Sequence, residues 1–269
     1  DMKQPPRSVV KRTRELLREK KARDAEGLFV VEGYKALYDA FHSGNIPAEA
    51  VCSEGFLNGD KGEGFTSSLE EAGVPVYLVG DAEMDRLSSL RNSQGILGVF
   101  SKPALPAADE NAAPSDIILL CDGIQDPGNM GAILRSAAAF GVKAVLLVND
   151  CADVHNPKSV RASSGAVFQV PVCSCGPEEI GRFKEQGFAV LAARPGGGAV
   201  DLEALREEKR PALVVLGSEG SGISPEIEEK ADVFFSIPIT EGVESLNVTA
   251  AAAVTLYVLS TARGARGRR

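Results

Sequence analysis

The chain has 269 residues, 44% of them hydrophobic and 25% charged, an ordinary composition for a globular protein with a substantial core. It lacks both an uninterrupted apolar stretch of about 18 residues and the apolar segment of a signal peptide, so we expect a cytoplasmic protein that is neither secreted nor membrane-inserted. Five cysteines, with no CxxC pair, and only two histidines support neither a disulfide framework nor a metal site.

The net charge of −8 is unevenly distributed along the chain. Residues 1–23 contain nine Lys/Arg and three Asp/Glu, and the final stretch RGARGRR adds four arginines and no acid. Without these 13 bases and three acids, the remaining chain holds 16 Lys/Arg against 34 Asp/Glu. Because nucleic acids are bound mainly through their phosphates, the basic ends are candidates for RNA contacts. Solvated basic ends on an acidic protein would explain the pattern equally well.

The first 100 residues predict a small α/β domain. Its expected helices cover 14–23 and 34–44, and its expected strands cover 28–33, 75–80 and 95–100. The stretch SKPALPAADENAAPSD then combines proline, alanine and acidic residues without apolar periodicity, which predicts a linker. We therefore place one domain at 1–100, the linker at 101–115 and a second domain at 116–269.

The second domain shows a cleaner alternation of apolar strands and amphipathic helices. Strands are expected at 116–121, 143–148, 166–172, 188–193, 212–217 and 233–239. The helices between and after them are expected at 131–140, 177–186, 201–209 and 224–231, followed by an alanine-rich final helix. This order predicts a parallel sheet that helices cover on both faces.

Three loops at expected carboxyl ends of strands carry unusual residues, and ligands of open α/β sheets bind at such ends. The first loop, DGIQDPGNMG at 122–131, has strong turn chemistry and precedes an apolar helix that contains Arg135. A capped turn would explain the loop by itself. The guanidinium of Arg135 could pair with an acid or reach toward a phosphate.

The second loop, GSEGSGIS at 217–224, is rich in glycine and contains Glu219. Its GxxGxG spacing differs from the dinucleotide fingerprint, and the chain contains no GxxxxGK[ST] phosphate loop. The glycines allow close approach of backbone to a ligand, and the carboxylate favours a neutral or cationic one. A turn in which Glu219 only caps neighbouring groups is the structural alternative.

The third loop, PITEGVESLN at 238–247, leads into the alanine-rich helix. Ser245 and Asn247 are both good N-cap residues, although a helix start needs only one. The second polar side chain is therefore a candidate for a ligand contact.

Together, the segments DGIQDPGNMGAILRSAAAFG, VVLGSEGSGIS and IPITEGVESLNVTAAAA resemble the three signature motifs of the SpoU (TrmH-like) branch of the SPOUT RNA methyltransferases. The intervening NPKSVRASSGAVFQVPV is also similar to this family, so the likeness covers residues 116–260. The N-terminal segments KKARDAEGLFVVEGYKAL and QGILGVF resemble an L30e-like substrate-binding domain, in shorter and less specific patterns.

The resemblance implies an α/β protein in which an L30e-like domain precedes a parallel-sheet SPOUT domain with a deep trefoil knot. It implies a homodimer that transfers a methyl group from S-adenosylmethionine to a ribose 2'-hydroxyl, without a metal. The N-terminal extension and the overall length favour 23S ribosomal RNA over transfer RNA as the substrate. The basic N-terminal segment would then attract RNA, and deleting residues 1–23 would weaken RNA binding without changing cofactor affinity.

The same resemblance assigns roles to individual residues. It places the cofactor against the backbone around Gly217, Ile237 and Leu246, with Ala193 as a less specific contact. It assigns the polar positions of the active site to Asn129, Arg135, Glu219, Ser245 and Asn247.

Arg135 has two possible roles in that site. It could act as the base, but a guanidinium pKa above about 12 makes its deprotonation costly. Alternatively, it holds the neighbouring phosphate and polarises the ribose hydroxyl, while Ser245 and Asn247 fix the geometry.

Two other classes of function compete with a methyltransferase. A non-catalytic RNA-binding or ribosome-assembly protein could share the fold, but it would not need Arg135, Glu219 and Asn247 together. A metabolic enzyme that uses a nucleotide would suit the acidic composition, but its phosphate-binding loop is missing.

Overall fold

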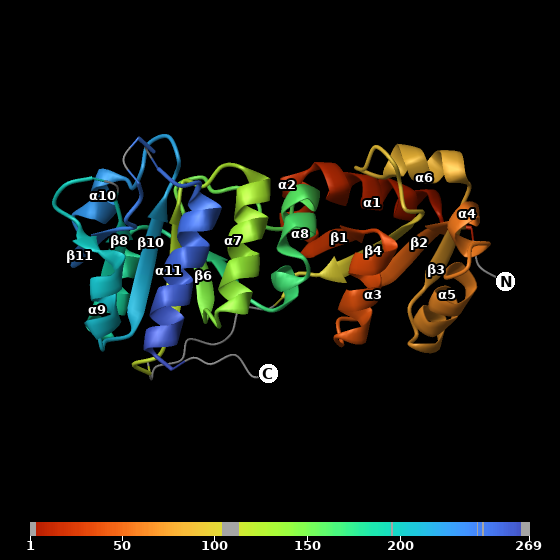
Figure 1. Ribbon diagram of the computed structural model, residues 1–269. Coiled ribbons are helices and arrows are strands. Elements are labelled where there is room, and N and C mark those ends of the chain that lie inside the picture. The colour runs from red at the N-terminus through yellow and green to blue at the C-terminus, as the bar shows by residue number, and fades with distance from the viewer. Residues whose placement is uncertain (1–3, 104–112, 195, 241, 244, 265–269) are drawn as a thin grey trace. The chain divides into compact units, whose positions relative to one another are not determined.

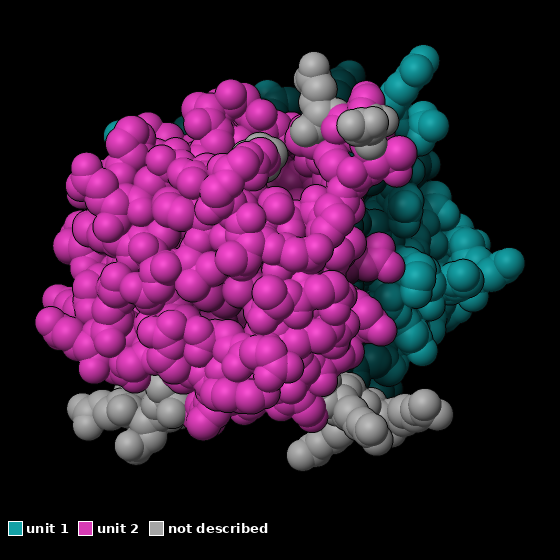
Figure 2. All heavy atoms as spheres, turned by 60° about the vertical axis from the view of Figure 1, so that its left-hand side comes forward, with its two compact units in different colours: residues 1–103, 155–168 teal, residues 104–154, 169–269 magenta. Residues whose placement is uncertain are grey.

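The computed structural model describes residues 4–103, 113–194, 196–240, 242–243 and 245–264. The chain forms two compact units, one made of residues 1–103 and 155–168 and the other of residues 104–154 and 169–269 (Figure 2). The sequence placed 155–168 in the second domain, whereas in the structure this segment packs within the first unit. Residues 104–112 of the predicted linker lie outside the described residues, so the linker stays a prediction.

Unit 1 is built on a four-stranded sheet in the order β1-β4-β2-β3. Strands β2 and β3 are parallel, and the other two pairings are antiparallel. The sequence did not predict β2, because its five residues are all buried and show no alternation of apolar and polar side chains. The strands are β1 (Leu28–Glu32), β2 (Glu49–Ser53), β3 (Val76–Val79) and β4 (Ile96–Ser101).

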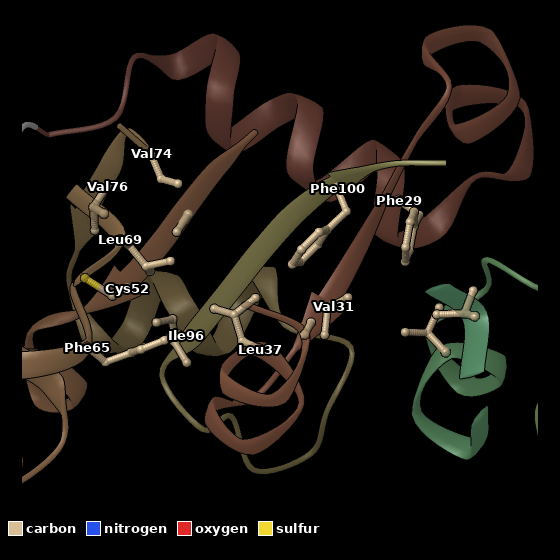
Figure 3. Packing of buried hydrophobic residues seen from close by; sticks show 14 residues of the cluster. Phe29, Val31, Leu37, Cys52, Phe65, Leu69, Val74, Val76, Ile96 and Phe100 are labelled. Atoms are coloured by element: carbon tan, nitrogen blue, oxygen red, sulfur yellow. The ribbon is translucent and has the colours of Figure 1, made fainter. Parts of the chain in front are cut away.

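Helices cover both faces of this sheet. Successive side chains of a strand point to opposite faces, so neighbouring residues of one strand pack against different helices. Val30 of β1 packs with α1 and α6, whereas Phe29 and Val31 pack with α3, α5 and α8, as Figure 3 shows for part of this core. The helix expected at 14–23 is divided at Glu19, whose backbone is extended. The helices are α1 (Arg7–Arg18), α2 (Lys20–Glu26), α3 (Tyr34–His42), α4 (Glu54–Leu57), α5 (Gly62–Glu71), α6 (Asp81–Leu87), α8 (Pro157–Ser163) and the 3-10 helix η1 (Ala166–Phe168).

Unit 2 contains the predicted parallel sheet, with seven strands in the order β7-β6-β5-β10-β8-β11-β9. Every pairing within it is parallel. The strands are β5 (Ile117–Asp122), β6 (Ala144–Val148), β7 (Val172–Ser174), β8 (Ala189–Ala193), β9 (Val200–Asp201), β10 (Ala212–Gly217) and β11 (Val233–Ser236). The carboxyl ends of β5, β10, β8 and β11 therefore meet at one edge of the sheet.

Helices cover both faces of the second sheet, as the alternation predicted. Ile180 of α9 (Glu179–Glu185) and Ile227 of α10 (Pro225–Glu228) pack on one face. On the other side, α7 (Pro127–Ala139) and α11 (Val248–Ala262) lie side by side (Figure 1). Among the described residues, no helix is long and apolar enough to cross a membrane. The trefoil knot implied by the resemblance stays a prediction.

Two expected elements of the second half were wrong. Residues 166–172 were expected to form a strand, but Ala166–Phe168 form a 3-10 helix and β7 starts only at Val172. Phe168 belongs to the core of unit 1, where its ring lies 4.9 Å from that of Phe100. A short apolar run fits a buried helical turn as well as a strand, so periodicity cannot separate them. The helix expected at 201–209 is a 3-10 helix, η2 (Leu202–Glu207).

Candidate active site

A cleft of about 760 Å³ lies at the carboxyl ends of β8, β10 and β11 in unit 2. Residues from five separate segments line it, because these three strand ends, Glu228 of α10 and the start of α11 converge there. The four residues that the resemblance assigned to cofactor binding are all in its wall, and so are two of the five polar ones. These six residues are Ala193, Gly217, Ile237, Leu246, Glu219 and Ser245.

Gly217 fixes the shape of the cleft's glycine-rich loop. After it, Ser218 and Gly222 exchange two backbone hydrogen bonds of 3.0 Å, which fold residues 218–222 back on themselves. A Cβ atom at Gly217 would lie 2.2 Å from the carbonyl carbon of Gly222, closer than real Cβ contacts allow. The tight return of the loop therefore requires glycine at this position.

Glu219 joins the three loops that the sequence singled out. Its Oε1 accepts hydrogen bonds from Asn129 Nδ2 at 3.2 Å, from Asn247 Nδ2, and from the backbone N–H of Val248 at 3.4 Å. Asn129 lies in the first turn of α7, and Asn247 precedes α11. Because helix N-termini carry partial positive charge, both helices favour a carboxylate here. Glu219, a residue of the cleft wall, is thereby hydrogen-bonded to α7 and to the start of α11.

The structure separates the roles of the two polar residues before α11. Asn247 is the N-cap, because its Oδ1 accepts the N–H of Thr249 at 2.9 Å. Ser245 lies in the wall of the cleft, and its hydroxyl makes no hydrogen bond with any residue that the structure describes. Ser245 is therefore the residue of this pair whose side chain is available to a ligand.

Arg135 lies on the exposed side of α7, opposite buried Ile133, Leu134 and Ala137. It is not part of the cleft wall. Within the described part of the chain, its guanidinium makes no hydrogen bond or ion pair. The pairing with an acid that the sequence left open is therefore not formed there, and the charge is available to an external group.

Three residues that support the glycine-rich loop of the cleft, Asp122, Asn149 and Ser224, were not predicted from the sequence. Asp122, only 3% exposed, ends β5 and accepts the N–H of Ser224 at 2.6 Å and Asn149 Nδ2 at 2.8 Å. These bonds anchor the end of the glycine-rich loop to the ends of β5 and β6. The signal available in the sequence was an aspartate at the end of an otherwise apolar strand, where a buried charge needs partners.

Replacing Asp122 with alanine should lower the free energy of unfolding by about 1–3 kcal/mol, because the half-buried Ser224 N–H would be left without an acceptor. The loosened loop should also weaken ligand binding in the cleft. Chemical denaturation tests the first effect, with Asp85→Ala as the control because Asp85 is an exposed aspartate of α6. Equal destabilisation by the two substitutions would contradict the anchoring role of Asp122.

Other charged side chains and thiols of unit 2 limit the kinds of reaction that the cleft could support. Arg194 lies over the Phe234 ring, 3.8 Å from its centroid, and 4.0 Å from Glu228. Burial raises the pKa of the Cys121 and Cys151 thiols, so neither is a ready nucleophile at neutral pH. In the described ranges of the chain, no group of three or more His, Cys, Asp or Glu is placed to hold a metal ion. The arrangement suits binding and alignment of a ligand.

Comparison with protein families gives two matches that together cover most of the chain. The model of the SpoU rRNA methylase family matches residues 116–257, more than half of the sequence. The model of the MRM3-like substrate binding domain matches residues 7–98. The second match lies entirely within residues 1–100, the range that the sequence assigned to a substrate-binding domain.

Individual relatives extend the same likeness over nearly the whole length. The 23S rRNA (guanosine(2553)-2'-O)-methyltransferase RlmP of Bacillus subtilis (strain 168) is 30% identical over 90% of this chain and 92% of its own. The structure of a putative RNA methyltransferase of the TrmH family from Porphyromonas gingivalis has a TM-score of 0.76 and 31% identity, covering 95% of this chain and 98% of that one. A solved RNA 2'-O ribose methyltransferase has a TM-score of 0.78 and 27% identity, covering 97% and 98%.

Proposed function

The chain belongs to the SpoU rRNA methylase family, and from this premise we propose that it methylates a ribose 2'-hydroxyl of 23S ribosomal RNA, with S-adenosylmethionine as the methyl donor. The observation that carries the proposal is the convergence of the predicted cofactor residues on one cleft, with Glu219 linking its mouth to α7 and α11. The name of the Bacillus subtilis relative supports the choice of RNA and of the ribose hydroxyl. A ribosomal RNA substrate implies a cytoplasmic enzyme.

The cleft fits S-adenosylmethionine in size and in charge. A volume of about 760 Å³ lies within the range of about 300–1,000 Å³ that is usual for small-molecule sites. Gly217 lines the cleft, and the carboxylate of Glu219 in the wall suits a cationic sulfonium, whereas Glu228 lies 4.0 Å from the guanidinium of Arg194. When bound, the cofactor supplies a methyl group that is already activated for transfer. Gly217, Ile237 and Leu246 would hold it, with Ala193 at the end of β8.

The chain's own residues must then align the acceptor hydroxyl and manage its proton. Arg135 would hold the phosphate next to the target ribose and polarise the hydroxyl, since its fork of donors suits a phosphate. The Ser245 hydroxyl, which has no hydrogen bond to any described residue, would orient the RNA or the cofactor at the cleft. Glu219, Asn129 and Asn247 would act by positioning, because their bonds to one another hold the three loops together.

We also propose that the protein works as a homodimer through the exposed sides of α7 and α11. Val254 and Tyr257 of α11 are 39% and 54% exposed, which is high for large apolar side chains on adjacent turns. The Tyr257 ring lies 6.1 Å from that of Phe140, which follows α7 directly. Arg135 is exposed on α7, so a partner subunit seated on this surface would lie close to it.

Tyr257→Lys should convert the dimer to a monomer, because it would place a charge in an apolar contact. Sedimentation equilibrium measures the change, and methyl transfer should fall with dimer content if the partner completes the site. Ile46→Lys is the matched control, because Ile46 is a 50% exposed apolar residue of unit 1. A dimer that persists unchanged in Tyr257→Lys would contradict this assignment of the interface.

The proposed activity is tested by incubating the purified protein with methyl-labelled S-adenosylmethionine and a 23S ribosomal RNA transcript. Label should appear in dinucleotides that resist alkaline hydrolysis, because a 2'-O-methyl group blocks strand cleavage at that ribose. Binding of cofactor and RNA without transfer would identify a non-catalytic protein. Absence of cofactor binding in calorimetry would favour a metabolic enzyme of another class.

A further inference from the structure

Helix α1 has two sharply different sides. Its buried side consists of Val9, Val10, Thr13, Leu16 and Leu17, which pack against the sheet of unit 1. Its other side carries bases at spacings of four, three and four residues, namely Arg7, Lys11, Arg14 and Arg18. At 3.6 residues per turn these four positions fall within a sector of about 60° and extend over about 16 Å. We call this set the α1 basic stripe.

The nine Lys and Arg residues of 1–23 differ in their contacts within the structure. Arg12 donates to Glu49 at 2.6 Å, a bond that raises the pKa of the guanidinium, and Arg23 is buried and donates to the carbonyl of Leu16 at 2.6 Å. These two arginines serve the fold. Lys3 lies outside the described residues, and Lys20 and Lys21 belong to α2.

The α1 basic stripe is, by contrast, nearly free of internal partners. Among the described residues, Lys11 makes a single ion pair, a long one of 3.7 Å with Glu15. Arg7, Arg14 and Arg18 make no hydrogen bond or ion pair with any other residue in the part of the chain that the structure describes. Four cations are thus aligned on one helix side, and within the described ranges of the chain one weak ion pair is their entire set of charged partners.

Three members of the stripe, Arg7, Lys11 and Arg14, also line a surface hollow of about 440 Å³. Glu54 and Glu83 belong to the wall of the same hollow. Carboxylates repel phosphates, but they accept hydrogen bonds from 2'-hydroxyls and from base amino groups. The hollow therefore combines cations suited to a phosphate backbone with acceptors suited to the sugar or base side of the same strand.

We propose that the α1 basic stripe binds the phosphate backbone of the RNA substrate, with the strand running along the helix axis and its sugar edge toward the hollow. Charge complementarity identifies the occupant, because the central chain holds 16 Lys/Arg against 34 Asp/Glu and supplies little attraction for a polyanion. The stripe carries no base-specific geometry, so it sets affinity and orientation while another surface selects the sequence. This inference rests on the proposed function.

Deleting residues 1–23, the experiment that the sequence suggested, is unsuitable as a test. It would remove Leu16 and Leu17, which are 0% and 4% exposed, together with the Arg12–Glu49 bond. Loss of so much of the core would unfold unit 1 and abolish RNA binding for an unrelated reason. Substitution of the four stripe side chains, of which Arg14 is half-buried and the others are exposed, separates the two effects.

The decisive variant changes all four bases of the stripe to glutamine, which retains helix propensity. RNA affinity is measured by fluorescence anisotropy at several salt concentrations, with a 23S ribosomal RNA fragment and an unrelated hairpin of equal length. We expect the slope of log K against log salt to shrink by about 3, since each lost phosphate contact contributes about 0.7 on single-stranded RNA. Affinity should fall by about tenfold or more for both RNAs.

The matched control removes the same number of charges from scattered exposed positions, by changing Lys35, Arg86, Arg182 and Lys209 to glutamine. Its salt slope should stay close to that of the unchanged protein. Thermal unfolding and S-adenosylmethionine calorimetry should be the same for both variants and the parent.

Three outcomes decide between the alternatives. If the stripe variant keeps the parent slope while the parent methylates ribosomal RNA, the stripe does not bind RNA, which would leave an acidic protein partner as its occupant and the proposed function intact. If the control loses as much slope as the stripe variant, net charge and not the stripe governs binding, and the inference is wrong. If the parent itself transfers no methyl group to RNA, it is the proposed function that fails.

Discussion

Arg135→Ala should reduce methyl transfer to RNA by about 10²-fold or more, the usual cost of removing one donor that acts in the transition state. S-adenosylmethionine should still bind with the affinity of the unchanged protein, because Arg135 is outside the cleft wall. The fold should also be unaffected, since Arg135 is exposed and has no partner among the described residues. Single-turnover transfer and calorimetry with the same preparation measure both effects.

Arg135→Lys separates the two roles that the sequence left open. If the guanidinium is the base, a lysine of lower intrinsic pKa should shift the pH dependence of transfer. If it holds a phosphate, lysine should raise the KM for RNA and leave the pH profile in place, because it keeps the charge but loses the bidentate fork. Undiminished methylation by Arg135→Ala would contradict both roles.

Gly217→Ala should abolish cofactor binding, with a loss in affinity of about 10²-fold or more. The added methyl group would lie 2.2 Å from the carbonyl carbon of Gly222 and 2.5 Å from the backbone nitrogen of Ile223. Neither atom can move independently, because Ser218 and Gly222 are paired and Ser224 is fixed to Asp122. The loop of residues 218–222 would therefore have to open, and the cleft would lose the part of its wall that this loop forms. Calorimetry with S-adenosylmethionine measures the result.

Gly181→Ala is the control for this substitution, because it adds the same methyl group to helix α9 of the same unit, outside the cleft wall. A Cβ at Gly181 meets no atom within 4 Å. Cofactor affinity and thermal stability should therefore remain close to those of the parent. Normal cofactor binding by Gly217→Ala would show that the ligand does not use this cleft.

Local sequence patterns predicted the second sheet well, because its central strands are continuous apolar runs bounded by polar loops. Parallel strands share one edge for their carboxyl ends, so the loops after β5, β10 and β11 were expected to be candidate ligand sites before their contacts were known. The prediction that these three loops form a single site, however, came from the resemblance and not from local sequence patterns.

The contacts that the sequence did not predict join residues far apart in the chain. Asp122 and Ser224 are 102 positions apart, and Asn129 and Glu219 are 90 apart. No local periodicity encodes such pairs. In the same way, the apolar run after Gly165 was expected to be a strand, because nothing local shows that Val167 and Phe168 pack into the core of unit 1. Tertiary packing decided that segment, as it often does for short apolar runs.

The competing roles of single residues could be separated only by geometry. Ser245 and Asn247 are equivalent as N-cap candidates in the sequence, and the bond from the Thr249 N–H identifies Asn247 as the cap. Similarly, nine bases near the N-terminus formed one charge cluster in the sequence. The structure divides them into two that support the fold, four that form the α1 basic stripe, and three others.

Whether this chain methylates a ribose of 23S ribosomal RNA is best tested by mass mapping of ribose methylation in cells with and without the gene. We expect one 2'-O-methylated nucleotide of 23S ribosomal RNA to lose its methyl group in cells without the gene. The methyl group should return with the unchanged gene but not with the Arg135→Ala variant. Identical ribose methylation of 23S ribosomal RNA in both strains would contradict the account.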